Sequence, residues 1–443
     1  MVRVKQPILD LQQGYTCQSS TFYFLIYFPI PLQPGEAWRH PFNRLNQQTR
    51  PGSNSRACHT HCPMYIQRLE SLADISATAW NALVQDHHPF LRHEFLSAME
   101  RHHCVGEHTG WLPCHSVCFD DKQRLIGAAP LYLKDNSYGE FVFDWSWADA
   151  YQRHGLRYYP KLVSAIPFTP ATGQRLLLAP GPQAAATAQA IIDQVLEEAR
   201  HQALSSIHWL FTTDQDRELL LSRSYLHRLG CQFHWRNPGY RDFADFLDTL
   251  NAKRRKNIKR ERRLVQEAGL TLEVLQGTQV SESQWHTFHR FYCSTFQRLG
   301  GIPTLTLSFF QEIATTLGER LVLVLASKGS RYVAGAISLC SDHTLYGRHW
   351  GCSADYDSLH FEACYYQGID YCIRRQLQQF EPGAQGEHKI YRGFLPTLTQ
   401  SVHWIAHPGF RSAIADFLQR EMPAVKHYAS DLVQHSPYRQ ETL

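Results

Sequence analysis

The stretch GAAPLYLKDNSYG (127–139) returns in altered form as GAISLCSDHTLYG (335–347), with Gly-Ala and the Gly of Tyr-Gly at the same spacing. Each copy completes a pair of apolar runs joined by a short polar turn, in HSVCFDDKQRLIGAAPLYL and in LVLVLASKGSRYVAGAISL. Such a pair predicts a β-hairpin, and Tyr138 or Tyr346 is expected to open a third strand. The repeated unit is therefore predicted to be a three-stranded meander.

The two copies begin at residues 127 and 335, a distance far beyond the roughly 20–50-residue periods of solenoids and propellers. This distance predicts two copies of one domain. A pair of tyrosines follows each copy, in HGLRYYPKLVSAIPF and in SLHFEACYYQGIDYCIRR, near the start of a segment with helical character. The alternative is that Gly-Ala and Tyr-Gly recur by chance in hairpins, where glycine is common.

Composition sets the class of protein. The chain has 443 residues, of which 43% are hydrophobic and 12% aromatic, enough to bury two sizeable cores. No apolar run approaches the roughly 20 residues of a membrane-spanning helix, so we expect a soluble protein without stable membrane insertion. The 12 cysteines are scattered and form no Cys-x-x-Cys pair, which favours a reducing cytoplasm and no metal site. We expect ordinary core residues at Cys340, Cys352, Cys364 and Cys372.

Residues 1–63 differ from the rest because they are rich in Pro, Arg, Asn and Ser and show no sustained period. They are predicted to be a leader segment that forms no hydrophobic core. Alternatively, the start codon is assigned too far upstream and these residues precede the true start of the protein. A signal peptide at TFYFLIYFPIPL (21–32) is disfavoured by its two prolines and missing cleavage site, and CHTHC (58–62) lacks a second ligand pair for zinc.

The folded part is expected to comprise a first lobe at 64–242 and a second at 243–443.

Helical and strand-like segments alternate from Met64 onward. Apolar spacing predicts helices at 65–83, 89–102 and 188–204 and a buried strand at 205–212. The second half repeats the scheme with helices at 281–299 and 308–317, a hairpin at 321–339, a third strand at 344–351, a helix at 359–377 and a strand at 379–384. The predicted fold class is mixed α/β, with a strand meander flanked by helices in each lobe. This order resembles that of acyltransferases of the GNAT type.

A basic segment lies between the predicted lobes, in NAKRRKNIKRERRLVQEAGL (251–270). Residues 253–263 carry eight Lys and Arg against Glu261, a net +7 within a chain whose total is +4. Apolar residues fall on one side of a predicted helix that Gly269 ends. A solvated helix face is the usual reading of such a run, but the uncompensated charge favours phosphate binding. The candidate phosphate-binding residues are Lys253, Arg254, Arg255, Lys259 and Arg260.

Three long segments resemble bacterial FemAB-like proteins, which are described as peptidoglycan biosynthesis proteins or GNAT-type acyltransferases: 253–274, 141–177 and 361–396. The resemblance covers nearly everything from Met64 onward. It implies two tandem GNAT-like lobes, with a basic helix at their junction. It also implies transfer of an amino acid from aminoacyl-tRNA to a peptidoglycan precursor. We therefore expect an N-acyltransferase that moves an acyl or aminoacyl group to an amine acceptor.

The richest polar cluster is FEPGAQGEHKIYRGF (380–394), which holds Glu387, His388, Lys389 and Arg392 after two glycines. Acyl transfer to an amine needs a base for the proton of the ammonium and a donor for the carbonyl oxygen. Glu387 or His388 is the candidate base, and Lys389 or Arg392 is the candidate group for an oxyanion or a phosphate. The alternative is a surface turn closed by an ion pair.

Two further groups are candidate substrate-binding residues. In DWSWADAY (144–151), the two Trp are expected on one face of a strand, where core packing is the commoner role. Asp144, Asp149 and Tyr151 are nevertheless candidates for lining an acceptor cleft, together with Arg153 and His154. In the predicted helix at 359–377, the first turns face the expected pocket, and a helix N-terminus favours anions. The candidates there are His360, Glu362, Tyr365 and Tyr366.

The loop GCSADYDSLHFEA (351–363) lacks the Gly-rich pattern with which GNAT enzymes that use acetyl-CoA hold the pyrophosphate. The absence disfavours the commonest GNAT donor, so the donor remains open between acyl-CoA and aminoacyl-tRNA, and no other cofactor is predicted. Two alternatives to an ordinary transferase follow. One is a non-catalytic double-lobe protein that binds a phosphate-bearing ligand, and the other is an acyl-CoA N-acyltransferase with a divergent loop.

Overall fold

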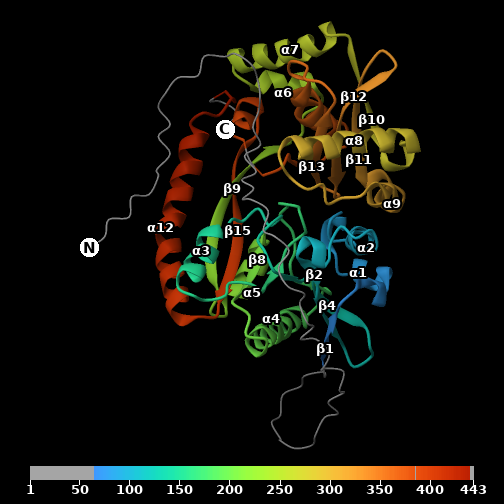
Figure 1. Ribbon diagram of the computed structural model, residues 1–443. Coiled ribbons are helices and arrows are strands. Elements are labelled where there is room, and N and C mark those ends of the chain that lie inside the picture. The colour runs from blue at the N-terminus through green and yellow to red at the C-terminus, as the bar shows by residue number, and fades with distance from the viewer. Residues whose placement is uncertain (1–63, 385, 440–443) are drawn as a thin grey trace, which may run out of the picture.

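The computed structural model describes residues 64–384 and 386–439 (Figure 1). The predictions for residues 1–63, including the leader, the signal alternative and the CHTHC segment, lie outside these residues. The described chain is a mixed α/β protein, as predicted, and its helices cover two β-sheets.

The larger sheet has 11 strands and runs through both halves of the chain. In spatial order it consists of β10 (Leu270–Gln276), β11 (Leu321–Lys328), β12 (Arg331–Cys340), β13 (Thr344–Cys352), β14 (Gln379–Glu381), β9 (Leu226–Arg236), β15 (Leu395–Ile405), β8 (Ser206–Leu210), β6 (Lys161–Ser164), β5 (Tyr132–Lys134) and β2 (Trp111–Pro113). The smaller sheet has four strands in the order β1 (Tyr65–Leu69), β3 (His115–Phe119), β4 (Leu125–Ala129) and β7 (Leu177–Leu178).

The second meander forms as predicted. Strands β11, β12 and β13 are antiparallel neighbours, and Tyr346 lies in the third of them. One face of this meander packs on α8 (Glu282–Arg298) and α9 (Leu307–Leu317), because alternate strand residues such as Leu323 and Ile337 share a core with the aromatic residues of both helices. The other face packs on one continuous helical segment, made of α10 (Leu359–Phe361), a π-helical turn (Glu362–Tyr366) and α11 (Gln367–Arg374).

The first meander is not continuous. Its hairpin β3–β4 forms as predicted, but the chain then leaves that sheet, and β5 pairs with β2 and β6 in the larger one. Tyr138 therefore does not open a third strand. It lies in a turn in which its backbone N–H donates to the side chain of Asn136, since asparagine readily bonds the backbone two residues onward.

Three other elements differ from the sequence-based expectation. The segment after Met64 is strand β1 followed by a short helix α1 (Ala77–Asn81), because its first five residues pair with β3. The tyrosines at 158 and 159 precede strand β6 and no helix, since Pro160 removes a backbone donor and the next four residues are fully buried beside β8. DWSWADAY forms helix α3 (Trp145–Arg153), in which Trp147 is buried and Trp145 only partly so.

The remaining predicted elements are confirmed. They are helices α2 (His93–Arg101), α4 (Ala184–His201), α8, α9 and α10–α11, and strands β8 and β14. The basic segment forms α7 (Ala252–Glu267), whose N-terminus is capped by Asn251 and whose buried residues include Ile258 and Val265. Helices α5 (Asp214–Leu221), α6 (Phe243–Thr249) and the long α12 (Pro408–Val433) complete the described chain.

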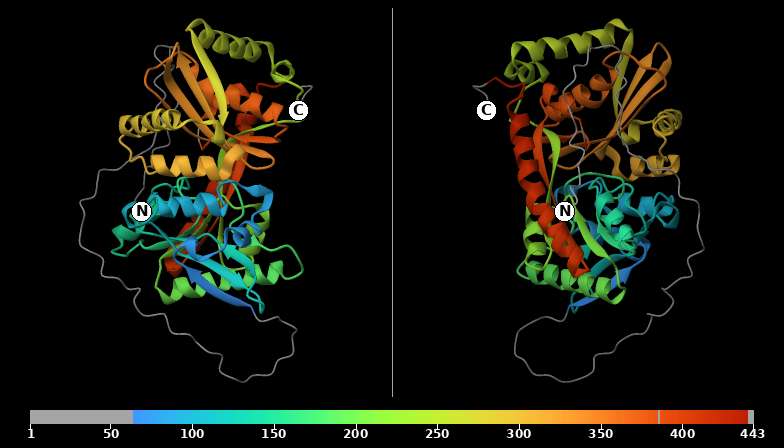
Figure 2. Two further views of the ribbon diagram at one scale, coloured as in Figure 1. Left: turned by 90° about the vertical axis from the view of Figure 1, so that its right-hand side faces the viewer. Right: turned by 60° about the vertical axis from the view of Figure 1, so that its left-hand side comes forward.

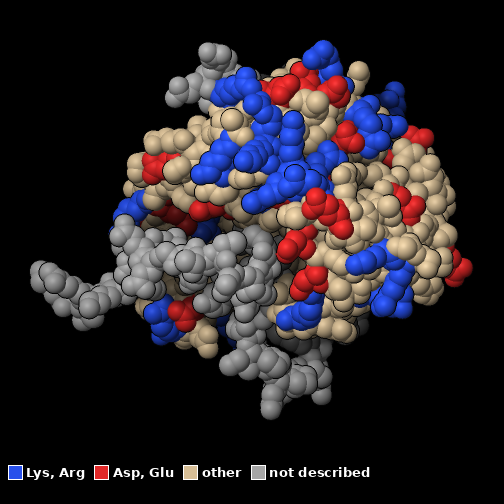
Figure 3. Space-filling model, turned by 90° about the horizontal axis from the view of Figure 1, so that it is seen from above, with Lys and Arg blue, Asp and Glu red and all other residues tan. Residues whose placement is uncertain are grey.

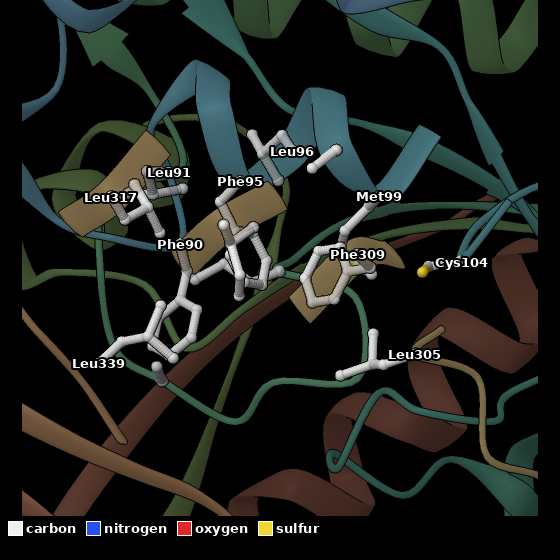
Figure 4. Close-up of a cluster of buried hydrophobic side chains, with 14 of the residues drawn as sticks. Phe90, Leu91, Phe95, Leu96, Met99, Cys104, Leu305, Phe309, Leu317 and Leu339 are labelled. Atoms are coloured by element: carbon white, nitrogen blue, oxygen red, sulfur yellow. The ribbon is translucent and has the colours of Figure 1, made fainter. Parts of the chain in front are cut away.

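The two halves of the chain are joined by packing and by strand pairing. Phe95 on α2 packs against Phe309 on α9 with ring centroids 5.4 Å apart, in the centre of the apolar cluster drawn in Figure 4. Strand β15 from the second half lies between β8 and β9, and α12 packs along β9 and β15 (Figure 2). The division of the chain near residue 242 remains a prediction from the sequence.

The predicted core cysteines are free thiols. Cys340, Cys352 and Cys372 are buried and Cys364 is partly buried. Burial raises the pKa of the Cys340 thiol to about 11, which suits a core residue better than a nucleophile. Among the described residues, no group of three or more His, Cys, Asp or Glu is arranged to hold a metal ion.

Gly351 on β13 passes so close to α8 that a side chain does not fit. An added Cβ would overlap with the backbone carbonyl of Phe291. Gly351→Ala is therefore expected to lower the free energy of unfolding by about 1–3 kcal/mol through overpacking, measured by urea denaturation. Gly409→Ala is the matched control, since in α12 the added methyl meets only side-chain atoms of His407, at 3.2 Å, and no backbone atom. Equal stability of the two variants would show that β13 and α8 are less tightly packed than described.

Candidate active site

The sheet opens between strands β13 and β14. The two strands are parallel and pair over three residues, ending with Tyr346 beside Glu381. Strand β13 then continues along β12 to Cys352, with a bulge that leaves Arg348 between the pairs Ser338–Gly347 and Ile337–His349. Strand β14 ends at Glu381. Ligands in open α/β sheets bind at the carboxyl ends of parallel strands, so this divergence is the candidate active site.

Lys389 lies at the divergence. It belongs to a 3₁₀ helix (Glu387–Arg392) that follows a loop in which Gly383 and Gly386 have φ of +99° and +120°, values that favour glycine. The Lys389 side chain is buried, and its Nζ donates to the carbonyl oxygen of Gly383 at 2.8 Å. No carboxylate of the described chain forms an ion pair with it. Burial lowers the pKa of this ammonium from 10.5 to about 7.

The two residues before Lys389 make different contacts. The Nε2 atom of His388 lies 2.9 Å from the hydroxyl of Tyr365, and burial lowers the pKa of His388 to about 4, so its ring is neutral at pH 7. Glu387 is exposed and accepts a hydrogen bond from Tyr428 of α12 at 2.7 Å. The structure therefore does not place Glu387 in the same buried site as Lys389.

The π-helical turn attaches the basic helix to this site. Glu362, which is buried, pairs with Arg262 of α7 at 3.1 Å. Arg392 is paired with Glu261 of α7 at 2.8 Å, and both contact the hydroxyl of Tyr366. Arg392 and Glu362 thus hold α7 against the site, and their charges are already compensated.

His360 is the remaining predicted residue of this helix. Its ring is packed between Trp350 and Tyr365, with centroids 5.4 Å from each. Burial lowers the pKa of His360 to about 3. Such a ring contributes packing and a neutral polar edge and is not converted to the charged imidazolium at pH 7.

The exposed side of α7 carries most of its positive charge. Lys253, Lys259 and Arg260 are exposed and have no ion-pair partner in the described chain. Arg254 stacks over the ring of Tyr391 at 3.8 Å, and Arg255 lies 3.5 Å from Asp248. Seen from above, Lys and Arg gather on this side of the molecule (Figure 3). Beside α7, residues of α7, β10 and the π-turn line an open groove of about 290 Å³.

The three candidates in the first half are not brought together. Asp144 is buried at the N-terminus of α3. Asp149 is exposed and forms an ion pair with Arg153 at 2.7 Å. Tyr151 is buried and stacks on Phe410 of α12 at 4.0 Å. The predicted acceptor cleft is therefore not formed by these residues.

Asp144 belongs to a buried charge network centred on Lys161. The Lys161 ammonium, which is 0% exposed, donates to Glu140 at 2.9 Å, to Ser137 at 2.8 Å and to Asp144. Burial raises the pKa of Glu140 to about 7 although Lys161 opposes the shift, whereas Lys161 overcomes burial and holds the pKa of Asp144 below its usual range.

The network continues from Asp144 to the C-terminal half. Tyr158 donates to Asp144 at 2.6 Å and lies 3.2 Å from His208, whose Nδ1 lies 2.6 Å from Nδ1 of His403 on β15. The pKa of His208 is lowered to about 3 by burial and by Lys161. The network is thus a fully packed connection between β6, α3, β8 and β15.

Glu381 was not predicted from the sequence. It ends β14 at the divergence and is 5% exposed, and burial raises its pKa to about 8. The sequence signal available for it was its place as the last residue of a short strand before Pro-Gly, the position at which parallel strands present their side chains to a ligand.

Comparison with known proteins gives the following. A family model named FemAB-like, described as peptidoglycan biosynthesis/recognition, matches residues 71–440. The solved structure of FemX shares 13% identity, covering 79% of this chain and 100% of that one, with a TM-score of 0.48. L-PGS from Bacillus licheniformis shares 11% identity, covering 68% of this chain and 88% of that one, with a TM-score of 0.43. A tandem GNAT protein from the clavulanic acid biosynthesis pathway shares 11% sequence identity with this chain. The match covers 78% of this chain and 99% of that one, with a TM-score of 0.42.

No curated protein matches the chain significantly. Within the described residues, no helix combines the length and the apolar character that crossing a bilayer requires.

Proposed function

Because the chain belongs to the FemAB-like family, we propose that it is an N-acyltransferase that moves an acyl or aminoacyl group to the amine of a peptidoglycan precursor. The observation that carries the proposal is the divergence of β13 and β14 with the buried ammonium of Lys389 at its end, which forms no ion pair within the described residues. Acyl transfer develops negative charge on a carbonyl oxygen, and a buried cation stabilises such charge strongly.

Lys389 acts in this proposal as the group that holds the carbonyl oxygen of the donor. A pKa near 7 leaves the ammonium partly deprotonated before the donor binds, and a developing oxyanion favours the protonated form. The fraction of Lys389 that is protonated therefore increases as negative charge develops on the carbonyl oxygen in the transition state. His388 and Tyr365 line the same side and position the loop that carries Lys389.

The donor is bound through its phosphates. Acyl-CoA and aminoacyl-tRNA both carry phosphates, and the exposed cations of α7 match either donor. The ion pairs of Arg262 with Glu362 and of Arg392 with Glu261 fix this helix beside the divergence. We place the reaction in the bacterial cytoplasm, where both donors are present.

The test uses the full chain with one nucleotide-linked peptidoglycan peptide that has a free amine. The protein is incubated with this acceptor and either a mixture of acyl-CoAs or charged tRNA, and the mass of the acceptor is recorded. A mass increase with one of the two donors supports the proposal and identifies the donor class. Binding of the acceptor without a mass increase under either condition would contradict it and favour a recognition protein.

Reversing charge on α7 is expected to weaken donor binding. The triple variant Lys253→Glu, Lys259→Glu, Arg260→Glu should bind the donor at least about tenfold more weakly, with a shallower dependence on salt, because fewer counterions are released. The measurement is a fluorescence anisotropy titration at two salt concentrations. Lys122→Glu with Arg157→Glu, both exposed in the first half, is the control. Equal weakening by the control would show a general charge effect.

A further inference from the structure

Glu381 faces the first half of the chain from the centre of the sheet. Its neighbour Phe380 packs into the core on the opposite face with Trp235 of β9. Since side chains alternate along a strand, Glu381 lies on the face of its cross-strand partner Tyr346. Continuing the antiparallel register of β14 and β9 places His234 opposite Glu381.

One carboxylate oxygen of Glu381 has no hydrogen-bond partner of close geometry within the described residues. Oε1 accepts a hydrogen bond from Gln379 at 2.8 Å, while Oε2 is buried and has no such partner within the described residues. A buried polar atom in this state costs about 1–3 kcal/mol, so it calls for an explanation such as a catalytic role or a bound group.

Burial outweighs the groups around Glu381 that stabilise its charge. Tyr346 faces it from β13, and Arg236 and His234 face it from β9. From the first half it is faced by Arg175 and by Thr172, whose backbone N–H hydrogen-bonds to the carboxylate and lowers its pKa against the effect of burial. The carbonyl of Thr172 lies 3.0 Å from Nε2 of His88. Arg175 already donates its guanidinium to four backbone carbonyls, those of Leu210, Gly173, Gln174 and Ala171.

Both Glu381 and the ammonium of Lys389 lie near the end of β14. The Lys389 ammonium bonds the carbonyl of Gly383, only two residues beyond Glu381. A donor carbonyl held by Lys389 would then lie within a few residues of Glu381 along the chain, beyond the end of β14. The amine that attacks this carbonyl would lie between the two side chains.

We propose that Glu381 is the catalytic base that takes a proton from the ammonium of the acceptor. The carboxylate of Glu381 accepts one proton, and the freed lone pair of the amine forms the C–N bond with the donor carbonyl carbon. The carbonyl electrons move to the oxygen held by Lys389. The intermediate then collapses, the bond to the ester oxygen or thioester sulfur breaks, and the leaving group takes the second proton of the nitrogen. Glu381 returns its proton to water.

The other candidate bases near this strand end fit less well. Burial lowers the pKa of His388 to about 4, and the pKa values of His234 and His88 to about 3, so all three are weak bases at neutral pH. Glu387 is exposed and bonded to Tyr428. The raised pKa of Glu381, about 8, suits a base that works near neutral pH.

This inference rests on the proposed function, and the variant Glu381→Gln tests it. Gln keeps the shape and the bond to Gln379 but takes up no proton, so we expect kcat to fall about 10²-fold with donor affinity unchanged. Glu381→Asp should recover part of the loss, and the rise of kcat with pH through about 8 should disappear in Glu381→Gln. Glu421→Gln, which removes a carboxylate paired with Arg228 far from the divergence, should be fully active.

A melting measurement separates catalysis from structure. A carboxyl group whose pKa is raised in the folded state stabilises the fold below the unfolded value of 4.5, and this advantage is lost as pH rises toward about 8. Glu381→Gln should therefore match the wild type in Tm near pH 5 and exceed it near pH 8.5. A lower Tm at both pH values would indicate a structural role and overturn the inference.

The outcomes also separate this inference from the proposed function. A wild-type protein that transfers from neither donor overturns both. An active wild type with an equally active Glu381→Gln variant overturns only the role of Glu381.

Discussion

Replacing Lys161 by Met is expected to lower the free energy of unfolding by about 3–5 kcal/mol. The substitution leaves Glu140 and Asp144 buried without the cation that lies between them, and neither carboxylate has access to water. Removing one member of a buried ion pair is far more costly than removing all members, because the remaining charge stays unsolvated. The measurement is urea denaturation at pH 7.

The triple variant Lys161→Met, Glu140→Gln, Asp144→Asn is the informative companion. It removes the charges together and should recover much of the loss. Lys122→Met is the matched single control, because Lys122 is exposed and should change stability by less than about 0.5 kcal/mol. A loss at Lys161 no larger than at Lys122 would contradict the network as described.

Replacing Lys389 by Met is expected to reduce acyl transfer by about 10²–10³-fold, the usual effect of removing one oxyanion donor. The fold should remain intact. Burial makes the Lys389 charge unfavourable below its pKa of about 7, so a neutral side chain of similar length is not expected to lower Tm at pH 6. The measurement is kcat for acceptor acylation, with circular dichroism to confirm folding.

Two comparisons make the Lys389 result specific. Lys426→Met on α12 removes an exposed lysine and should retain full activity. Donor binding by Lys389→Met, measured by anisotropy, should stay within about threefold of the wild type, because the phosphates are held by α7. Retained transfer by Lys389→Met would place the oxyanion elsewhere and exclude Lys389 from the chemistry.

Local sequence signals predicted the second half of the fold better than the first. There, apolar alternation, turn residues and helix periodicity agree with one another, and strands β11 to β13 pair as consecutive neighbours. In the first half, the hairpin at residues 115–129 was predicted, but its successor β5 joins another sheet. No periodicity indicates which sheet a strand of three residues will join, because that choice depends on tertiary packing.

The site shows the same limit. Lys389 was predicted because it stands in a crowded polar segment after two glycines. Glu381 stands in the same segment, but its buried surroundings include Thr172 and Arg175, which are distant in sequence. Glu387 was predicted with equal reason and lies on the surface, bonded to Tyr428 of a helix that was not predicted. Composition identifies the segment, whereas tertiary neighbours decide which of its charges are buried.

Strand β15 has a consequence for the order of folding. It pairs with β8 on one side and with β9 on the other, although more than 150 residues separate it from both. During synthesis β8 and β9 therefore emerge with unpaired edges that no strand can close until residue 405 has left the ribosome. Contacts of such separation slow folding, and open strand edges invite association with other chains. We therefore expect that this chain most needs a chaperone during synthesis, while its first half is complete and β15 has not yet emerged.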